Sequence, residues 1–281
     1  MKAKTIEKEI EKKITDWASS IEDKSLAEDL PSHVIVTGGC IASMLLKETV
    51  NDFDIYLSTP EIAFRLAAYY VEKSGVNARL QVQDSNDIEW FEKDDICISE
   101  IERVQVFIKS SGVASVEPDK DKKYQAIFFS SNAITLTDKV QVILRFTGNA
   151  KEIHTNYDFI HATNYWSLEE GLVTNTRALE CILARELIYT GSKYPLSSIF
   201  RTRKFIQRGW CCHVANYLKM AIQLNDLDLM DIDVLRDQLT GVDLAYLSGI
   251  ADALESADSL TSAYVIKVIE RMLGEKDTDS Q

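Results

Sequence analysis

The stretch VIVTGGCIASMLLKETVNDFDIYL, residues 34–57, decides the fold of this chain. The β-branched run at 33–37 predicts a buried strand, and Gly38-Gly39 then ends it, because two glycines allow a sharp bend. A short helix is expected over 41–47. After it, Asn51–Leu57 alternates between apolar and polar side chains, which predicts a second strand.

Two aspartates, Asp52 and Asp54, share one face of this second strand. Residues two apart on a strand lie about 6.5–7 Å apart at the backbone, so the two carboxylates can converge on divalent cations. Two such cations ~3.5–4 Å apart would clamp the attacking and leaving oxygens of a phosphoryl displacement. The bare N–H groups at Gly38-Gly39 and the start of the following helix favour a phosphate.

This order of elements resembles the DNA polymerase β-like nucleotidyltransferase superfamily. The signature of that superfamily is a strand, Gly-Gly or Gly-Ser, a spacer, and then Asp-hydrophobic-Asp-hydrophobic, here Gly38-Gly39 and Asp52-Phe53-Asp54-Ile55. The resemblance implies that Asp52 and Asp54 ligate two Mg²⁺ ions. It also implies that Gly38 and Gly39 hold the phosphates of a nucleoside triphosphate such as ATP, with a hydroxyl from Thr37 or Ser43.

The superfamily also has a third carboxylate on a neighbouring strand, placed to activate the attacking hydroxyl and to share a metal ion. Asp158 is our candidate, because it alternates with Tyr157 and Phe159 at the start of a segment, 158–163, that we expect to be a short strand. Glu100 and Glu102 are its rivals, because they precede the strand expected at 104–108.

One departure from the family pattern concerns the residues just after the glycines. CCA-adding enzymes and bacterial poly(A) polymerases share the Gly-Gly form and usually carry Arg-Asp there, whereas this chain has Ala42-Ser43. The chain is also short for such an enzyme. Both points argue against a standard CCA-adding role.

The remaining pattern predicts an α+β fold, in which a mixed β-sheet nucleotidyltransferase domain precedes an all-helical C-terminal domain. Residues 1–30 are expected to form an N-terminal helical extension, since Ile6, Ile10, Ile14 and Trp17 recur at helical spacing. The catalytic domain would cover 31–166. The helical domain would cover 167–281, with apolar positions such as Leu244 and Leu254 on one helix face.

Positive charge is concentrated in the helical part. Residues 187–225 contain no acidic residue and carry a charge of +6, so the rest of the chain must carry −13 − 6 = −19. Arg201, Lys204 and Arg208 fall on one helix face, and Lys193 precedes them. These four residues could bind the triphosphate or a nucleic-acid 3′ end. The alternatives are a solvated basic face or pairing with the acidic segment at 226–237.

The composition limits the class of protein further. The chain has 281 residues, a net charge of −13 and a pI near 4.8, which argues against a broad duplex-DNA surface. Five cysteines without a CxxC spacing indicate reduced thiols in a cytoplasmic protein. The four histidines show no zinc-binding spacing. No apolar run approaches the ~20 residues of a membrane span, and the charged N-terminus does not resemble a signal peptide.

These observations predict a metal-dependent nucleotidyltransferase. An acceptor hydroxyl would attack the α-phosphorus of a nucleoside triphosphate, and pyrophosphate would leave. The basic helix favours an RNA 3′ end as acceptor, with tRNA one example. The alternatives are a small molecule such as an aminoglycoside, a protein side chain modified by a toxin-like enzyme, or a second nucleotide. An inactive nucleotide-binding scaffold and a structural interaction protein are the non-enzymatic alternatives.

Overall fold

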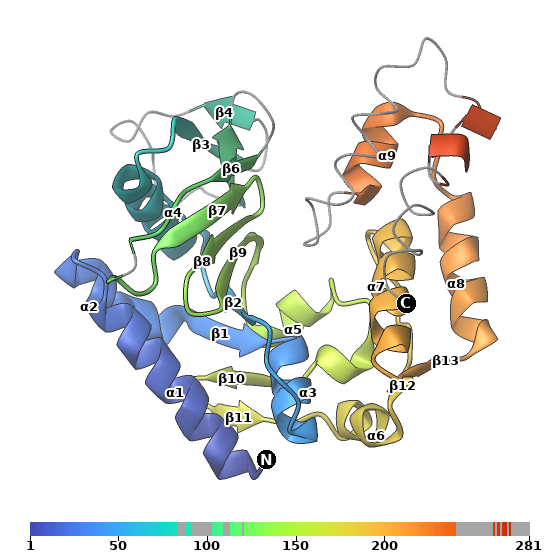
Figure 1. Cartoon of the computed structure of the whole chain (residues 1–281), viewed down its shortest axis with the longest axis horizontal. Helices are drawn as coiled ribbons and strands as arrows, with labels where there is room; N and C mark the ends of the chain where they lie inside the picture. The colour runs from blue at the N-terminus through green and yellow to red at the C-terminus, as the bar shows by residue number, and fades with distance from the viewer. Residues whose placement is uncertain are drawn as a thin grey trace. The chain divides into compact units, whose positions relative to one another are not determined.

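The computed structural model describes residues 1–83, 88–90, 103–108, 113–119 and 121–239, and near the C-terminus residues 261, 263, 264, 266–268 and 270. It divides into two units, Met1–Ala184 and Arg185–Gln281. The helices of the first unit are α1 (Ala3–Ser19), α2 (Lys24–His33), α3 (Gly39–Leu46), α4 (Pro60–Ser74), α5 (Ala150–His154), the 3₁₀ turn η2 (Ile160–Ala162) and α6 (Thr176–Ala184) (Figure 1).

An eight-stranded mixed sheet forms the centre of the first unit, in the order β11-β10-β1-β2-β9-β8-β7-β6. The pair β2–β9 is parallel, and the other neighbours are antiparallel. The strands are β1 (Val34–Thr37), β2 (Phe53–Leu57), β6 (Val113–Ser115), β7 (Ala126–Ser130), β8 (Ala133–Leu136), β9 (Val140–Thr147), β10 (Tyr165–Ser167) and β11 (Gly171–Val173). The sequence stretch at 34–57 therefore supplies two adjacent central strands.

The two faces of this sheet have different characters. On one face, Val36, Ile55 and Val142 join the large apolar core, together with side chains of α1, α2 and α4. On the other face, Ile35, Tyr56 and Ile143 pack against α5 in a smaller cluster. Alternation along each strand produces this division, because successive side chains point to opposite faces.

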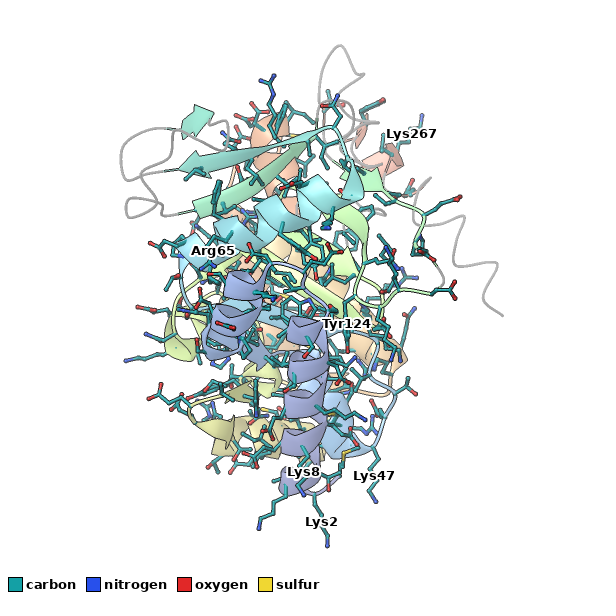
Figure 2. The ribbon with its side chains drawn as sticks, turned by 90° about the vertical axis from the view of Figure 1, so that its left-hand side faces the viewer. Lys2, Lys8, Lys47, Arg65, Tyr124 and Lys267 are labelled. Atoms are coloured by element: carbon teal, nitrogen blue, oxygen red, sulfur yellow. The ribbon has the colours of Figure 1, made fainter. Side chains whose placement is uncertain are left out.

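Helix α1 is part of the core of the first unit. Its buried stripe is the predicted one, and Trp17 donates a hydrogen bond of 2.7 Å from Nε1 to the hydroxyl of Tyr70 on α4. Lys8 lies on the exposed side of the helix and Lys2 is its N-cap residue, and both side chains point away from the body (Figure 2). Residues 1–30 thus pack against the sheet within the first unit.

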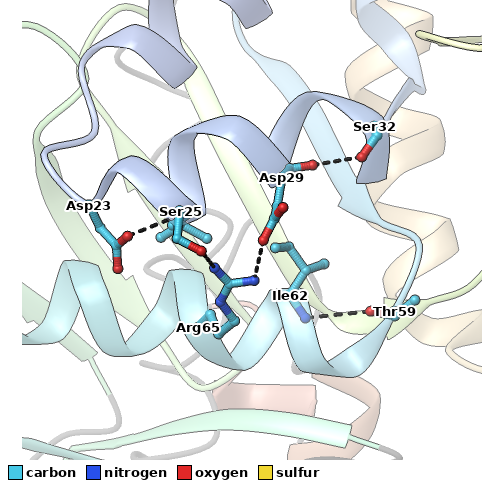
Figure 3. A network of polar contacts seen from close by, with 8 residues as sticks. Asp23, Ser25, Asp29, Ser32, Thr59, Ile62 and Arg65 are labelled. Carbon is cyan, nitrogen blue, oxygen red and sulfur yellow. Dashed lines mark hydrogen bonds and ion pairs between the residues drawn. The ribbon is translucent and has the colours of Figure 1, made fainter.

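Helices α2 and α4 are joined by a polar network (Figure 3). Arg65 Nη1 lies 2.7 Å from Asp29 Oδ2, and Arg65 Nη2 donates to the hydroxyl of Ser25 at 3.1 Å. Helix α2 is capped by Asp23, and α4 is capped by Thr59 and begins with Pro60. Exposed pairs of this kind contribute about 0–1 kcal/mol each, so burial of the apolar faces supplies most of the stability.

A separate three-stranded antiparallel sheet completes the first unit. Its order is β4-β3-β5, with β3 at Ala78–Gln83, β4 at Ile88–Trp90 and β5 at Arg103–Ile108. The second unit contains the short strands β12 (Glu186–Leu187) and β13 (Cys211–Cys212), which pair in parallel, and the helices α7 (Pro195–Gln207), α8 (Val214–Asn225) and α9 (Ile232–Leu239).

The α+β class is confirmed, and the second unit is helical as predicted, with the β12–β13 pair in addition. The units divide at 184/185, later than the boundary predicted near 166, because β10 and β11 extend the main sheet and α6 contacts η2 and α3.

The strand predicted at 158–163 is wrong. That segment forms a bend and the turn η2, because the chain must reverse before it enters β10.

The four cysteines in the described part of the chain are all free thiols. Among the helices in the described ranges, none combines the length and the apolar character that crossing a bilayer requires. The predicted apolar helix face that includes Leu244 and Leu254 lies outside the described residues.

Candidate functional site

The bend at Gly38 lies directly against the carboxylate of Asp54. Gly38 has φ 91° and ψ −152°, a backbone region that is open almost only to glycine. A Cβ at this position would lie 2.9 Å from Oδ2 of Asp54 and 3.5 Å from the hydroxyl of Tyr157. The sheet register explains the proximity, because Thr37, the residue before the bend, pairs with Asp54 across β1 and β2.

The start of α3 is open beside this carboxylate. Gly38 is the N-cap residue, and because it has no side chain it cannot cap the N–H groups of the first turn. A Cβ at Gly39 would meet nothing within 4 Å. An uncapped helix start presents backbone N–H groups and the positive end of the helix dipole, so this opening suits an anion.

Asp52 lies just before β2 with an exposed side chain. Both Asp54 and Asp52 act electrostatically on the thiol of Cys40, in the first turn of α3. Burial, together with these two carboxylates, raises the pKa of the Cys40 thiol, so that it stays protonated.

Thr37 and Ser43, the two hydroxyls predicted to assist the glycines, are both buried, with exposed fractions of 0% and 5%. The hydroxyl of Thr37 lies 2.8 Å from Nε2 of His154 and 2.9 Å from the carbonyl oxygen of Asn164. Thr37 therefore fixes the end of β1 in place. A phosphate contact from either hydroxyl would require its side chain to turn out of the interior.

Three aromatic side chains adjoin this bend. The His154 ring lies 5.1 Å from the Tyr157 ring and 5.8 Å from the Tyr165 ring. Burial lowers the pKa of His154 to about 4, so its imidazole is neutral near pH 7. Burial and the neighbouring Tyr56 and Asp54 raise the pKa of Tyr157 well above its usual value, so its hydroxyl keeps its proton.

A row of polar side chains crosses the sheet at the level of Asp54. Thr37 pairs with Asp54, Asp54 pairs with Gln141 on β9, and Gln141 pairs with Thr135 on β8. Paired residues in adjacent strands point to the same face, so Gln141 is the side chain of β9 that stands beside Asp54. This position, on a strand next to that of Asp54, is occupied by an uncharged amide.

Asp158, the predicted third carboxylate, is half-buried in the bend that follows Tyr157. Within the described residues, no three His, Cys, Asp or Glu side chains come together as a possible metal site, so Asp52, Asp54 and Asp158 do not form a ready three-carboxylate cluster. The rivals Glu100 and Glu102 lie outside the described residues.

The predicted basic residues all lie in the second unit. Arg201 and Lys204 lie on α7, Arg208 is its C-cap residue, and Lys193 precedes the helix with its side chain exposed. Arg208 lies over the ring of Phe205, at 5.5 Å from the ring centroid. Their role in nucleotide or RNA binding remains a prediction.

Sequence reasoning missed Gln141, Tyr157 and His154. A signal for Gln141 was present, because it is a single polar residue inside the apolar run VQVIL of β9. The signal for His154 and Tyr157 was absent, because they reach Thr37 and Gly38 only after α5 folds back on the sheet.

Among solved structures, several CCA-adding enzymes are similar to this chain. The Thermotoga maritima CCA-adding enzyme complexed with tRNA is 12% identical, with a TM-score of 0.39, over 92% of this chain and 53% of that one. A CCA-adding enzyme with ATP is 12% identical, with a TM-score of 0.43, over 94% of this chain and 50% of that one. The chain thus spans about half the length of these structures.

No curated protein matches the chain in sequence. A family model described as Gabija anti-defense 2 family protein matches residues 8–185, which is more than half of the chain and nearly all of the first unit. The chain, with its glycine bend held against Asp54, belongs to the Gabija anti-defense 2 family.

Proposed function

We propose that this chain is a metal-dependent nucleotidyltransferase that acts against the Gabija defence, to which the name of its family refers. The observation that carries the proposal is the contact between Gly38 and Asp54 at the open start of α3. An acidic side chain beside an open helix start supports the proposal, because nucleotidyl transfer needs a ligand for the cation next to donors for the phosphates.

The residues present fit a triphosphate with a divalent cation. The open space beside Gly39 would admit phosphate oxygens to the backbone N–H groups of α3. Asp52 and Asp54 would hold Mg²⁺ with the phosphates, because Mg²⁺ in such sites uses one or two carboxylates and the substrate oxygens. When bound, the cation would neutralise charge on the triphosphate and on the leaving pyrophosphate.

In the reaction, an oxygen–phosphorus bond forms between the acceptor hydroxyl and the α-phosphorus, and the bond from the α-phosphorus to the bridging oxygen breaks. Pyrophosphate leaves with that oxygen, and the proton of the hydroxyl passes to Asp158, our candidate for the third carboxylate. The chain's own contribution is mainly positioning, because the cradle fixes the triphosphate and Asp54 fixes the charge beside it. His154 is neutral and engaged with Thr37, so it supports the bend and carries no charge to the site.

For the acceptor we propose an RNA 3′ end, supported by the basic residues of α7. The test is incubation of the full-length protein with each α-³²P-labelled nucleoside triphosphate, Mg²⁺, total RNA and a bacterial lysate. Label in RNA, in protein or in a small product identifies the acceptor.

Asp52→Ala should abolish transfer and leave the fold intact, because this side chain is exposed. Asp16→Ala, an equally exposed aspartate on α1, is the matched control and should keep full transfer. Wild-type transfer by the Asp52→Ala protein would show that the site is wrongly assigned.

One observation favours a second candidate, nucleotide binding without transfer. Gln141 cannot act as a base, and the described residues contain no three-ligand metal group. A protein of this kind would bind labelled ATP and leave every acceptor unlabelled in the same experiment.

A further inference from the structure

Gln141 occupies the position on β9 nearest to Asp54. The parallel register pairs the two residues, and adjacent strands lie about 4.8 Å apart, so their side chains stand next to each other on one face. The neighbouring position on this face is apolar, since Ile143 and Tyr56 belong to the cluster under α5. Gln141 is therefore a polar residue that the packing of this face does not require.

The amide of Gln141 is only partly used within the protein. Its Nε2 approaches the hydroxyl of Thr135 at 3.5 Å, a long contact. Its Oε1 is buried and has no hydrogen-bond partner. A buried acceptor without a partner is unfavourable, which indicates that a donor on a bound molecule or its hydration shell completes it.

The charge at this position determines how strongly the site can hold a cation by itself. A glutamate at 141 would place a third carboxylate beside Asp54 and Asp52. In the native chain, the described residues contain no group of three His, Cys, Asp or Glu side chains that could hold a metal ion. Glutamine removes that charge and the repulsion that it would create in the empty site. Two carboxylates, one of them exposed, leave most coordination positions of Mg²⁺ to water or phosphate.

We propose that Gln141 makes cation binding depend on the nucleotide: the site takes its divalent cation together with the triphosphate and holds it only weakly alone. This inference rests on the proposed function, because it assumes that Asp52 and Asp54 face a metal–nucleotide complex. Gln141 is a positioning residue in this account, and its neutral amide receives a hydrogen bond from water or substrate in that complex.

The test measures binding of Mn²⁺ to the full-length protein by electron paramagnetic resonance, without nucleotide and with the non-hydrolysable analogue α,β-methylene-ATP. The native chain should bind Mn²⁺ about a hundredfold more tightly with the analogue. Gln141→Glu should bind Mn²⁺ alone about tenfold or more tighter than the native chain. Gln141→Asp is the second variant, should the glutamate disturb folding.

Thr135→Glu is the matched control. It adds the same charge in the same polar row, one strand further from Asp54, and should change Mn²⁺ binding less than about threefold. An equal gain in Thr135→Glu and Gln141→Glu would overturn the proposal, because it would reflect general charge. Unchanged Mn²⁺ binding in folded Gln141→Glu and Gln141→Asp would also overturn it.

Tight Mn²⁺ binding by the native chain alone would overturn the proposal in another way, because it would require a third carboxylate such as Glu100 or Glu102. The proposed function fails separately. If the native chain binds no Mn²⁺ with the analogue, or if Asp54→Asn binds it as tightly as the native chain, the site is not a metal–nucleotide site, and the inference about Gln141 falls with it.

Discussion

Gly38 and Asp54 are in such close contact that a single added carbon at position 38 would lie 2.9 Å from Oδ2 of the carboxylate. The bend and the acidic strand are therefore one structural unit, although 15 residues separate them in the printed sequence. A carbon at the neighbouring Gly39 would meet only open space. These two glycines can be tested separately, because the fold requires glycine at position 38, whereas the proposed phosphate site uses the open space at position 39.

Gly38→Ala should destabilise the protein by about 2 kcal/mol or more, because alanine is strained at φ 91° and would press on Asp54. Gly39→Ala should leave the unfolding free energy within about 0.5 kcal/mol of the native value, since nothing in the protein lies in its way. It should nevertheless weaken ATP binding about tenfold or more, because the methyl group would occupy the phosphate cradle. Denaturant unfolding and calorimetric titration with ATP measure both effects, and native ATP affinity in Gly39→Ala would exclude this cradle.

The three candidates for the third carboxylate make different predictions. Asp158→Asn should reduce nucleotidyl transfer about a hundredfold if Asp158 accepts the proton of the attacking hydroxyl. Glu100→Gln and Glu102→Gln should then stay within about twofold of the native rate. The rate constants of the purified variants at saturating ATP decide among them, and a large loss confined to Glu100→Gln or Glu102→Gln would assign the role to that residue.

His154 makes the stability of the fold depend on pH. Burial lowers its pKa to about 4 in the folded protein, below the ordinary 6.5, so the unfolded chain binds a proton more readily between these values. Stability should consequently fall as the pH drops from about 6.5 towards 4. At pH 5 the partly exposed ring should account for about 1 kcal/mol of that loss. Urea unfolding of the native chain and of His154→Gln at pH 7 and pH 5 measures it, and an equal loss in both proteins would contradict this role.

Helix α1 should be required for the stability of the first unit. Ile10→Ala should cost about 2–5 kcal/mol, because Ile10 is fully buried in the core that also contains the main sheet. Glu9→Ala, on the exposed side of the same helix, should change stability by less than about 0.5 kcal/mol. Circular dichroism during urea unfolding gives both values. A loss in Ile10→Ala as small as that in Glu9→Ala would mean that residues 1–30 are a dispensable extension.

The basic residues of α7 should contribute to RNA binding. Lys204→Glu should weaken binding of a fluorescein-labelled single-stranded RNA and reduce the slope of affinity against salt by about 1, the value expected for one lost phosphate contact. Lys8→Glu, on the exposed side of α1, is the control for net charge (Figure 2). Equal losses in the two variants would indicate a general charge effect and no local RNA site.

Much of the fold near the site could be predicted from the sequence because its signals are local. Alternation placed Phe53 and Ile55 in the core and left Asp54 on the opposite face, and the helical spacing of Ile6, Ile10, Ile14 and Trp17 identified the buried side of α1. The strand predicted at 158–163 was wrong for a related reason. Its apolar residues are buried by the packing of η2 against α3 and α6, which a local pattern cannot distinguish from burial in a sheet.

The site itself was predicted in part. The local motif located Gly38 and Asp54, and the structure brings them into contact. The partners that come from distant segments were not predictable, because the parallel register that places Gln141 beside Asp54 joins strands more than 80 residues apart. The contact between His154 and Thr37 likewise joins residues that are 117 positions apart in the sequence.

The division of the chain at 184/185 has a practical meaning when it is set beside the family match, which ends at residue 185. The matched segment contains both the bend at Gly38 and the acidic strand β2. Gly38, Asp54 and Gln141 all lie before this border, so replacing the segment after Ala184 would leave each of these residues in its own strand or bend.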